Sequence, residues 1–197
     1  MPTLIPDLGR CAVLSMDLQA AIVDAYAKNQ PDLLPRVAAI LRQARERGMA
    51  VIHVQVGFRP GLPEVSERNP LFGAIRNSIQ WQQMFQGPAG AIHPTVAPQA
   101  DDIVVTKHRV SAFAGSDLGM ILRAREIETL VLFGIATSGV VLSTLLEASD
   151  LDYRLIVVGD CCLDQDQEVH ACLLNKVFAR RATVVTASEL FSGTGAS

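Results

Sequence analysis

Short apolar segments that alternate with helix-like segments are the feature that most restricts the fold of this chain. Continuous apolar runs rich in Val, Ile and Leu are typical of parallel strands covered on both faces. Six segments have this composition: residues 11–16, 50–56, 102–106, 129–133, 154–158 and 182–186. Helical segments lie between them, so the βαβ pattern predicts a three-layer α/β/α, Rossmann-like fold with an open six-stranded parallel sheet.

Apolar residues at helical spacing mark the faces that the helices should bury against this sheet. The spacing i, i+3, i+4 and i+7 recurs in several places before a stop such as Gly48. The residues with this spacing are Val37, Ile40, Leu41 and Ala44; Leu118, Ile121 and Leu122; Val141, Leu145 and Ala148; and Val169, Cys172 and Leu173.

The length of the chain predicts one domain over residues 1–197, with loose termini at 1–10 and 192–197. Residues 57–99 interrupt the regular pattern with many prolines and glycines and only short helical stretches. An irregular excursion of this length after a strand is typical of a functional loop or an oligomer contact.

Charge and cysteine content limit the classes of partner and compartment. The formal net charge is −3 and basic residues form no run, which argues against nucleic acid and anionic membrane as partners and favours a small neutral or anionic metabolite. Residues 129–146 carry no charge, but their centre, GIATSG, is small and polar, so we expect a packed strand–turn–helix there and not a membrane span. The N-terminus lacks the pattern of a signal peptide, and the cysteine spacing indicates reduced thiols and a cytoplasmic protein.

Polar residues at the ends of the predicted strands are the first candidates for a site, because ligands of open parallel sheets bind beyond the carboxyl ends of the strands. Asp17 follows the first strand, residues 57–59 follow the second, Lys107 follows the third and GIATSG follows the fourth. A carboxylate and an ammonium at neighbouring strand ends can form a polar pair in an apolar pocket. Either residue alone is equally well explained as a helix cap or a solvated surface charge.

Three blocks of sequence resemble the isochorismatase-like, or cysteine hydrolase, superfamily. They are SMDLQ around Asp17, VVTKHRVSAF around Lys107, and LVLFGIATSGVVLSTLLEASDLDYRLIVVGDCC, in the family's order and spacing. The resemblance extends over about residues 12–189 and implies an isochorismatase-like fold with an active site of Asp, Lys and usually Cys. It implies that Asp17 is the general acid/base and that Lys107 is the family's lysine.

The third block departs from the pattern of family members that hydrolyse amides. Their motif resembles G-[VIL]-A-T-x-x-C-V, and the seventh residue counted from Gly134 is Val140, which cannot attack a carbonyl. The resemblance still implies an oxyanion site made by the N–H groups of Ala136 and Val140, and a cis peptide between Ile135 and Ala136. Isochorismatases also lack the cysteine: they protonate a vinyl ether with the aspartate and add water, a mechanism that tolerates Val140.

Other polar residues near the turn are candidates to replace the missing thiol. Thr137 and Ser138 lie in the turn, where Ser138 suits the N-cap of a helix over residues 138–151. Cys161 and Cys162 follow the fifth strand, but cysteine is among the most buried residue types, so a catalytic role is the weaker interpretation. Core positions are expected for Cys11 and Cys172.

Neither a metal nor a cofactor is expected. The four histidines share no ligand spacing, the corner after the second strand lacks the family's Asp-x-His motif, and His53 is better explained as a satisfied core histidine. Arg59 and Arg109 suit a carboxylate substrate, although surface ion pairs explain them equally well. Trp81 suits either the pocket or a dimer contact. The residues expected to line the substrate pocket are Phe58, Arg59, Trp81, Arg109, Phe113 and Thr137.

Together these features predict an isochorismatase-family hydrolase that acts on a small metabolite through Asp17 and Lys107, without a covalent cysteine thioester. The alternative is a non-catalytic family member that serves as a small-molecule binding or oligomeric assembly module. In either case we expect a homodimer or a higher homo-oligomer.

Overall fold

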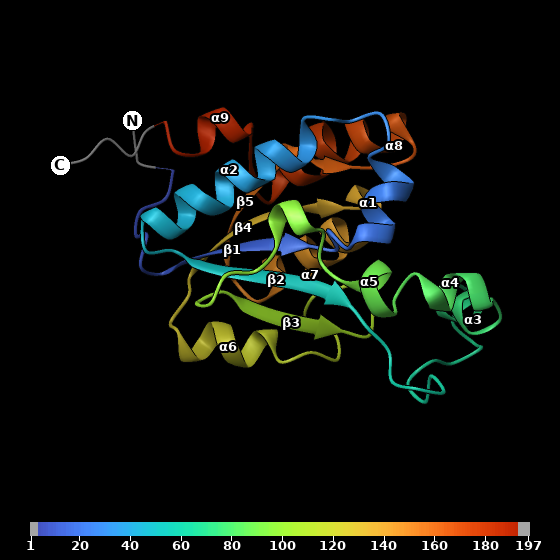
Figure 1. Ribbon diagram of the computed structural model, residues 1–197. Coiled ribbons are helices and arrows are strands. Elements are labelled where there is room, and N and C mark those ends of the chain that lie inside the picture. The colour runs from blue at the N-terminus through green and yellow to red at the C-terminus, as the bar shows by residue number, and fades with distance from the viewer. Residues whose placement is uncertain (1–3, 193–197) are drawn as a thin grey trace.

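The computed structural model describes residues 4–192 and contains one parallel sheet at its centre (Figure 1). The strand order is β3-β2-β1-β4-β5-β6, and every neighbouring pair is parallel. The strands are β1 (Cys11–Met16), β2 (Ala50–Val56), β3 (Ile103–Lys107), β4 (Thr129–Ile135), β5 (Arg154–Leu163) and β6 (Thr183–Val185). The predicted six-stranded parallel sheet is confirmed, and β5 continues well past its predicted end at residue 158.

Helices cover both faces of the sheet. The helices are α1 (Ala20–Tyr26), α2 (Leu33–Glu46), α3 (Pro70–Arg76), α4 (Ile79–Gln83), α5 (Gly87–Gly90), α6 (Leu118–Ala124), α7 (Leu142–Asp150), α8 (Gln167–Cys172) and α9 (Ala187–Leu190). Figure 1 shows α2 in front of the sheet and α7 behind it. Because parallel crossovers are right-handed, the connections that lead from β1 to β2 and from β4 to β5 must lie on opposite faces.

The core follows the predicted helical faces with one exception. Every residue of β1 and β4 is buried, as are the predicted faces of α2 and α7. On α8 the prediction is wrong: Val169 is 38% exposed and Cys172 is exposed. The reason is that α8 lies on the surface with none of its residues buried, and the first buried residue, Leu173, belongs to the π-type turn Leu173–Val177 that follows the helix.

Residues before β1 pack more closely than a loose terminus would. Ile5 is 2% exposed, and Leu4 and Leu8 contact the core cluster. The predicted tail at 192–197 lies outside the described residues except for Ser192.

The irregular connection between β2 and β3 carries its own small apolar cluster. Leu62, Val65, Phe72 and Ile75 are buried together, apart from the main core. Figure 1 shows α3 and α4 of this connection beyond the carboxyl ends of the strands. The connection therefore lies at the edge of the sheet where a site is expected. Within residues 4–192, no helix is both long and apolar enough to cross a membrane.

Candidate active site

The centre of the sheet has the topology that opens a crevice at the carboxyl ends of its strands. From β1 the chain continues to β2 on one side, and from β4 it continues to β5 on the other side. Connections that leave neighbouring strands in opposite directions create a switch point, which is where open α/β sheets bind ligands. Asp17 directly follows β1, and the turn Thr137–Val141 follows β4.

Asp17 and Lys107 form a buried ion pair. Lys107 is the last residue of β3, and its Nζ lies 2.9 Å from Asp17 Oδ2. The exposed fractions of the two side chains are 8% for Asp17 and 2% for Lys107. Nζ also donates a hydrogen bond of 3.0 Å to the carbonyl of Arg109, whereas Asp17 Oδ1 is buried without a hydrogen-bond partner. The two predicted residues thus meet, with one carboxylate oxygen left for another ligand.

Burial changes the pKa of Asp17. Desolvation raises the pKa of Asp17 above its usual range, and the charge and hydrogen bond of Lys107 act in the opposite direction without cancelling it. A carboxyl group with a raised pKa keeps a proton at a higher pH than an exposed aspartate. This is the property of a general acid.

The turn after β4 is fixed by close contact with β1. Gly134 has φ of +148°, and a Cβ at this position would lie 2.1 Å from the carbonyl oxygen of Met16. Only glycine fits so close to the neighbouring strand. The peptide between Ile135 and Ala136 is cis, as the family resemblance implies. Val140 is 2% exposed, so an apolar side chain fills its place in the turn.

Thr137 and His170 form a pair that joins this turn to α8. Thr137 Oγ1 lies 2.8 Å from His170 Nδ1, and Thr137 is fully buried. Desolvation lowers the pKa of His170, and the nearby Asp164 carboxylate opposes this change. Asp164 Oδ2 also accepts a hydrogen bond of 2.7 Å from the N–H of Ser138.

The predicted role of Ser138 as an N-cap is wrong. The chain enters a π-type turn at Thr137–Val141 before α7 begins at Leu142, and no side chain caps either segment. The side chain of Ser138 is exposed, and its N–H is satisfied by Asp164 instead.

Both predicted carboxylate-binding arginines already have protein partners. Arg59 Nη1 lies 3.6 Å from Glu64 Oε1 and is 65% exposed, which fits the surface ion pair that the sequence also allowed. Arg109 donates hydrogen bonds to the carbonyls of His108 and Glu64, and its guanidinium lies 5.3 Å from the centre of the Phe72 ring. These contacts tie Arg109 to the β2–β3 connection.

The predicted aromatic residues lie in three different places. Phe58 packs edge-on against Phe72 and Phe85, with ring centres 6.1 and 5.5 Å apart. Phe113 lies 6.1 Å from Tyr153. Trp81 on α4 is 42% exposed. Their roles toward a substrate stay predictions.

The cysteines differ in their access to solvent. Cys11, Cys161 and Cys162 are buried, whereas Cys172 is exposed, which corrects its predicted core position. Burial raises the pKa of Cys161 and raises that of Cys162 to about 12. Thiols of this kind stay protonated at neutral pH and are poor nucleophiles.

His53 is buried in β2 with one of its two ring nitrogens bonded. Its Nε2 lies 3.2 Å from Asp102 Oδ2, but its Nδ1 has no hydrogen-bond partner, so the predicted satisfied histidine is satisfied on one side only. Within residues 4–192, no three His, Cys, Asp or Glu side chains come together as a group able to hold a metal ion.

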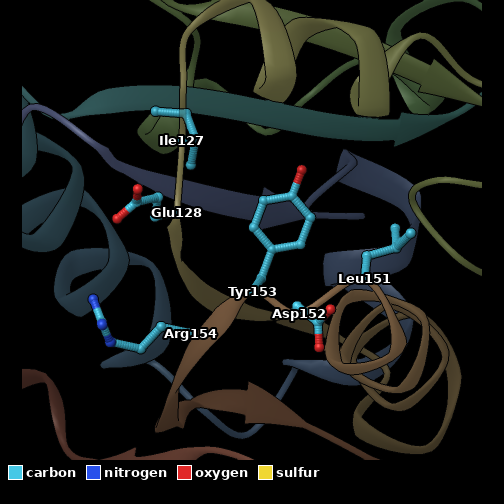
Figure 2. A pocket seen from close by; sticks show the side chains of 6 residues that line it. All are labelled: Ile127, Glu128, Leu151, Asp152, Tyr153 and Arg154. Atoms are coloured by element: carbon cyan, nitrogen blue, oxygen red, sulfur yellow. The ribbon is translucent and has the colours of Figure 1, made fainter.

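Two surface pockets lie at the opposite, amino-terminal edge of the sheet. The first pocket has a volume of about 420 Å³. Its residues Glu128 and Arg154 lie at the start of β4 and β5, and Figure 2 shows Tyr153 between these two residues and Leu151. The second is lined by Arg45, Asp102 and Arg125, among others. Neither contains Asp17, Lys107 or the turn after β4.

The fold and its strand-end acid–lysine pair define an α/β domain of the isochorismatase-like class. The isochorismatase domain family matches residues 11–189. Maleamate amidohydrolase of Pseudomonas putida is 29% identical over 165 residues, which are 83% of this chain and 75% of that protein. The isochorismatase family protein YwoC of Bacillus subtilis is 30% identical over 96% of both chains.

A solved structure agrees with these sequence matches. An isochorismatase family protein from Burkholderia thailandensis superposes with a TM-score of 0.82 at 28% identity, over 98% of this chain and 97% of that one. The chain belongs to the isochorismatase family, and the prediction of a hydrolase of this family is confirmed.

The sequence does not single out His170 and Asp164, which contact the turn after β4. The cause is the end of β5, which was expected at residue 158 but lies at Leu163. With the true end, the same rule that selected Asp17 and Lys107 would have selected Asp164, the next residue. His170 lies on the helix that follows, and only the folded contact with Thr137 connects it to the turn.

Proposed function

We propose that the protein hydrolyses a small metabolite through Asp17 and Lys107 without forming a cysteine thioester. The observation that supports this most is the buried ion pair with a free carboxylate oxygen: Asp17 Oδ1 lacks a partner while Oδ2 is held by Lys107. A proton on Asp17 can be given to a leaving group or to a substrate carbon, and Lys107 restrains the carboxyl group in the required orientation.

The absence of a thioester is proposed from the residues around the turn. Val140, at the position that the family resemblance assigns to the nucleophile, is apolar and buried. The buried thiols of Cys161 and Cys162 have raised pKa values, so neither supplies a thiolate at neutral pH. The main-chain N–H groups of Ala136 and Val140 would then polarise an oxygen of the substrate, as an oxyanion site does.

The choice of test compounds follows from the names of relatives. Similar proteins are named maleamate amidohydrolase, ureidoacrylate amidohydrolase and isochorismatase. The panel therefore contains small acid amides including maleamate, ureidoacrylate, simple esters, and vinyl ethers including isochorismate. Product release is followed by liquid chromatography with mass detection.

The variant that tests the proposal is Asp17→Asn, which keeps the shape of the side chain but cannot carry the proton. Loss of a general acid lowers kcat by about 100-fold or more. Asp101→Asn, which removes an exposed carboxylate at the other edge of the sheet, should leave kcat unchanged. Full activity of Asp17→Asn would refute the proposal.

A protein that turns over nothing in the panel but gains thermal stability with one of the compounds would instead be a binding module. This alternative keeps the same residues and the same family and gives up only the chemistry.

A further inference from the structure

The ammonium of Lys107 is held by two acceptors, and one of them is a main-chain carbonyl. Its Nζ lies 2.9 Å from Asp17 Oδ2 and donates a hydrogen bond of 3.0 Å to the carbonyl of Arg109. An ammonium rotates freely about its last bond, so the positions of its acceptors decide where its protons point. The orientation of the acid–lysine pair therefore depends on the position of the Arg109 carbonyl.

The main chain is anchored to the rest of the fold on either side of Arg109. Before it, the N–H of Gly57 donates a hydrogen bond of 3.1 Å to the carbonyl of Lys107, which continues the ladder between β2 and β3. After it, the N–H of Ala112 donates a hydrogen bond of 3.0 Å to Thr144 Oγ1 on α7. The carbonyl of Arg109 lies between these anchors, so its position depends on what holds the chain between them.

The guanidinium of Arg109 fastens this part of the chain to the β2–β3 connection. It donates a hydrogen bond of 2.6 Å to the carbonyl of His108 and one of 2.8 Å to the carbonyl of Glu64. Because a guanidinium is planar and presents its donors in a fixed fork, these two bonds set the spacing of the two main-chain segments. The ring of Phe72 lies 5.3 Å from the same group, and Val110 packs against the apolar cluster of the connection.

We propose that Arg109 is a positioning residue of this hydrolase: its side chain binds the β2–β3 connection, and its carbonyl thereby holds Lys107 Nζ at Asp17. This inference rests on the proposed function. It replaces the predicted role of Arg109 as a ligand of a substrate carboxylate, because the guanidinium already binds two protein carbonyls and an aromatic ring.

The ammonium protons of Lys107 test this role without a substrate. The chain has three lysines, of which Lys28 and Lys176 are exposed and Lys107 is buried. In protein with isotope-labelled lysine, proton–nitrogen NMR detects a buried ammonium whose protons exchange slowly with water, and Lys107→Met identifies the signal by its loss. We expect Arg109→Met to speed this exchange by about tenfold or more, since Nζ then loses a fixed acceptor.

Arg76→Met is the matched control. Arg76 on α3 also donates hydrogen bonds to two carbonyls of the connection, those of Leu62 and Val65, at 3.3 and 2.9 Å. These partners belong to the connection itself and not to the segment after β3, so the exchange of the Lys107 protons should keep the wild-type rate. An unchanged rate in Arg109→Met, or an equal acceleration in Arg76→Met, would overturn the inference.

Arg109→Lys is a second variant that keeps the test usable where Arg109→Met does not fold. It retains the positive charge and a long side chain, but it lacks the planar fork that joins two carbonyls. The exchange rate of the Lys107 protons should therefore lie between those of the wild type and Arg109→Met. A wild-type rate in Arg109→Lys would show that the fork is not needed and would reject the positioning role.

Kinetics on a compound that the wild type hydrolyses give a second readout. A displaced Lys107 disturbs the reacting groups, so we expect Arg109→Met to lower kcat by about 10- to 100-fold with a smaller change in KM. Arg76→Met should keep the wild-type kcat. If Arg109 bound a substrate carboxylate instead, KM would rise while kcat stayed unchanged, and this result would contradict the inference.

The two readouts separate this inference from the proposed function. A panel without turnover rejects the proposed function, and the exchange of the Lys107 protons then still decides whether Arg109 positions the ammonium. Turnover that depends on Asp17 but keeps the wild-type kcat and KM in Arg109→Met supports the proposed function and rejects the positioning role.

Discussion

Lys107 Nζ lies 2.9 Å from Asp17 Oδ2, and both side chains are almost fully buried. Removal of one partner from a buried pair costs about 3–5 kcal/mol where the other group stays charged. Asp17, whose pKa is already raised by burial, can take up a proton when Lys107 is removed, so we expect Lys107→Met to lose stability up to this size at neutral pH. The double variant Asp17→Asn/Lys107→Met should recover a large part of it, because no charge then remains. Urea unfolding of the four proteins of this double-mutant cycle measures the effect.

An exposed ion pair provides the control for this cycle. Arg42 and Glu46 face each other on α2 at 3.3 Å, with exposed fractions of 65% and 53%. Such a pair contributes about 0.5 kcal/mol or less, so Arg42→Met should leave the unfolding free energy nearly unchanged. A loss for Lys107→Met no larger than for Arg42→Met would contradict the burial of the pair.

Gly134→Ala tests the contact between the turn and β1. An added Cβ would overlap the carbonyl oxygen of Met16 at 2.1 Å, and the backbone at φ +148° is unfavourable for alanine. Because the contact is with backbone, no side chain can move away, and we expect a loss of about 3 kcal/mol in unfolding free energy.

Gly119→Ala on α6 is the comparison for this variant. Its new Cβ would lie 3.3 Å from Nη1 of Arg123, at the end of a long flexible side chain, and in ordinary van der Waals contact with Cδ1 of Phe113 at 3.9 Å. In a helix this change should be neutral or stabilising by about 0.5–1 kcal/mol. Equal effects of the two substitutions would show that the contact of Gly134 with β1 is unimportant.

The sequence predicted the sheet because apolar runs and helical spacing report burial directly. The same information places Asp17 and Lys107, since both lie at strand ends that topology brings to one edge. It misplaced the end of β5, because the last residues of that strand, GDCCL, lack the continuous apolar character of its first half. Asp164 was therefore not recognised.

Contacts between residues distant in sequence account for the remaining errors. The pairing of Thr137 with His170 crosses 33 positions, and that of Arg109 with the Glu64 carbonyl crosses 45. No local pattern encodes such contacts.

The error at Ser138 has a local cause. The residue type of Ser138 suits the N-terminus of a helix and so predicts an N-cap, but the π-type turn displaces the start of α7 to Leu142.

Thiol reactivity should distinguish Cys172 from the other cysteines. Cys172 is exposed, whereas Cys11, Cys161 and Cys162 are buried and have raised pKa values. Iodoacetamide at neutral pH should therefore alkylate the native protein once, and Cys172→Ser should not react. The urea-denatured wild type should react at all its cysteines. Rapid alkylation of Cys161 or Cys162 in the native protein would restore a thiol-based mechanism.

His53 should make stability depend on pH. Burial lowers its pKa in the folded protein, although Asp102 opposes this change, while in the unfolded chain the pKa is about 6.5. Between these two values the unfolded chain binds the proton more readily. The contribution of His53 to stability is therefore complete above about pH 6.5 and is lost as the pH falls below it.

His53→Gln isolates this contribution, because Gln cannot titrate but keeps a donor for Asp102 in place of Nε2. His170 and Asp17, whose pKa values are lowered and raised, add the same pH dependence to the wild type and to His53→Gln. The quantity to measure is therefore the difference between the unfolding free energies of the two proteins at each pH. Unfolding free energies from urea titrations between about pH 5 and pH 8 should converge as the pH falls, by at most about 1.4 kcal/mol per pH unit. Parallel curves would mean that His53 has the same proton affinity in both states.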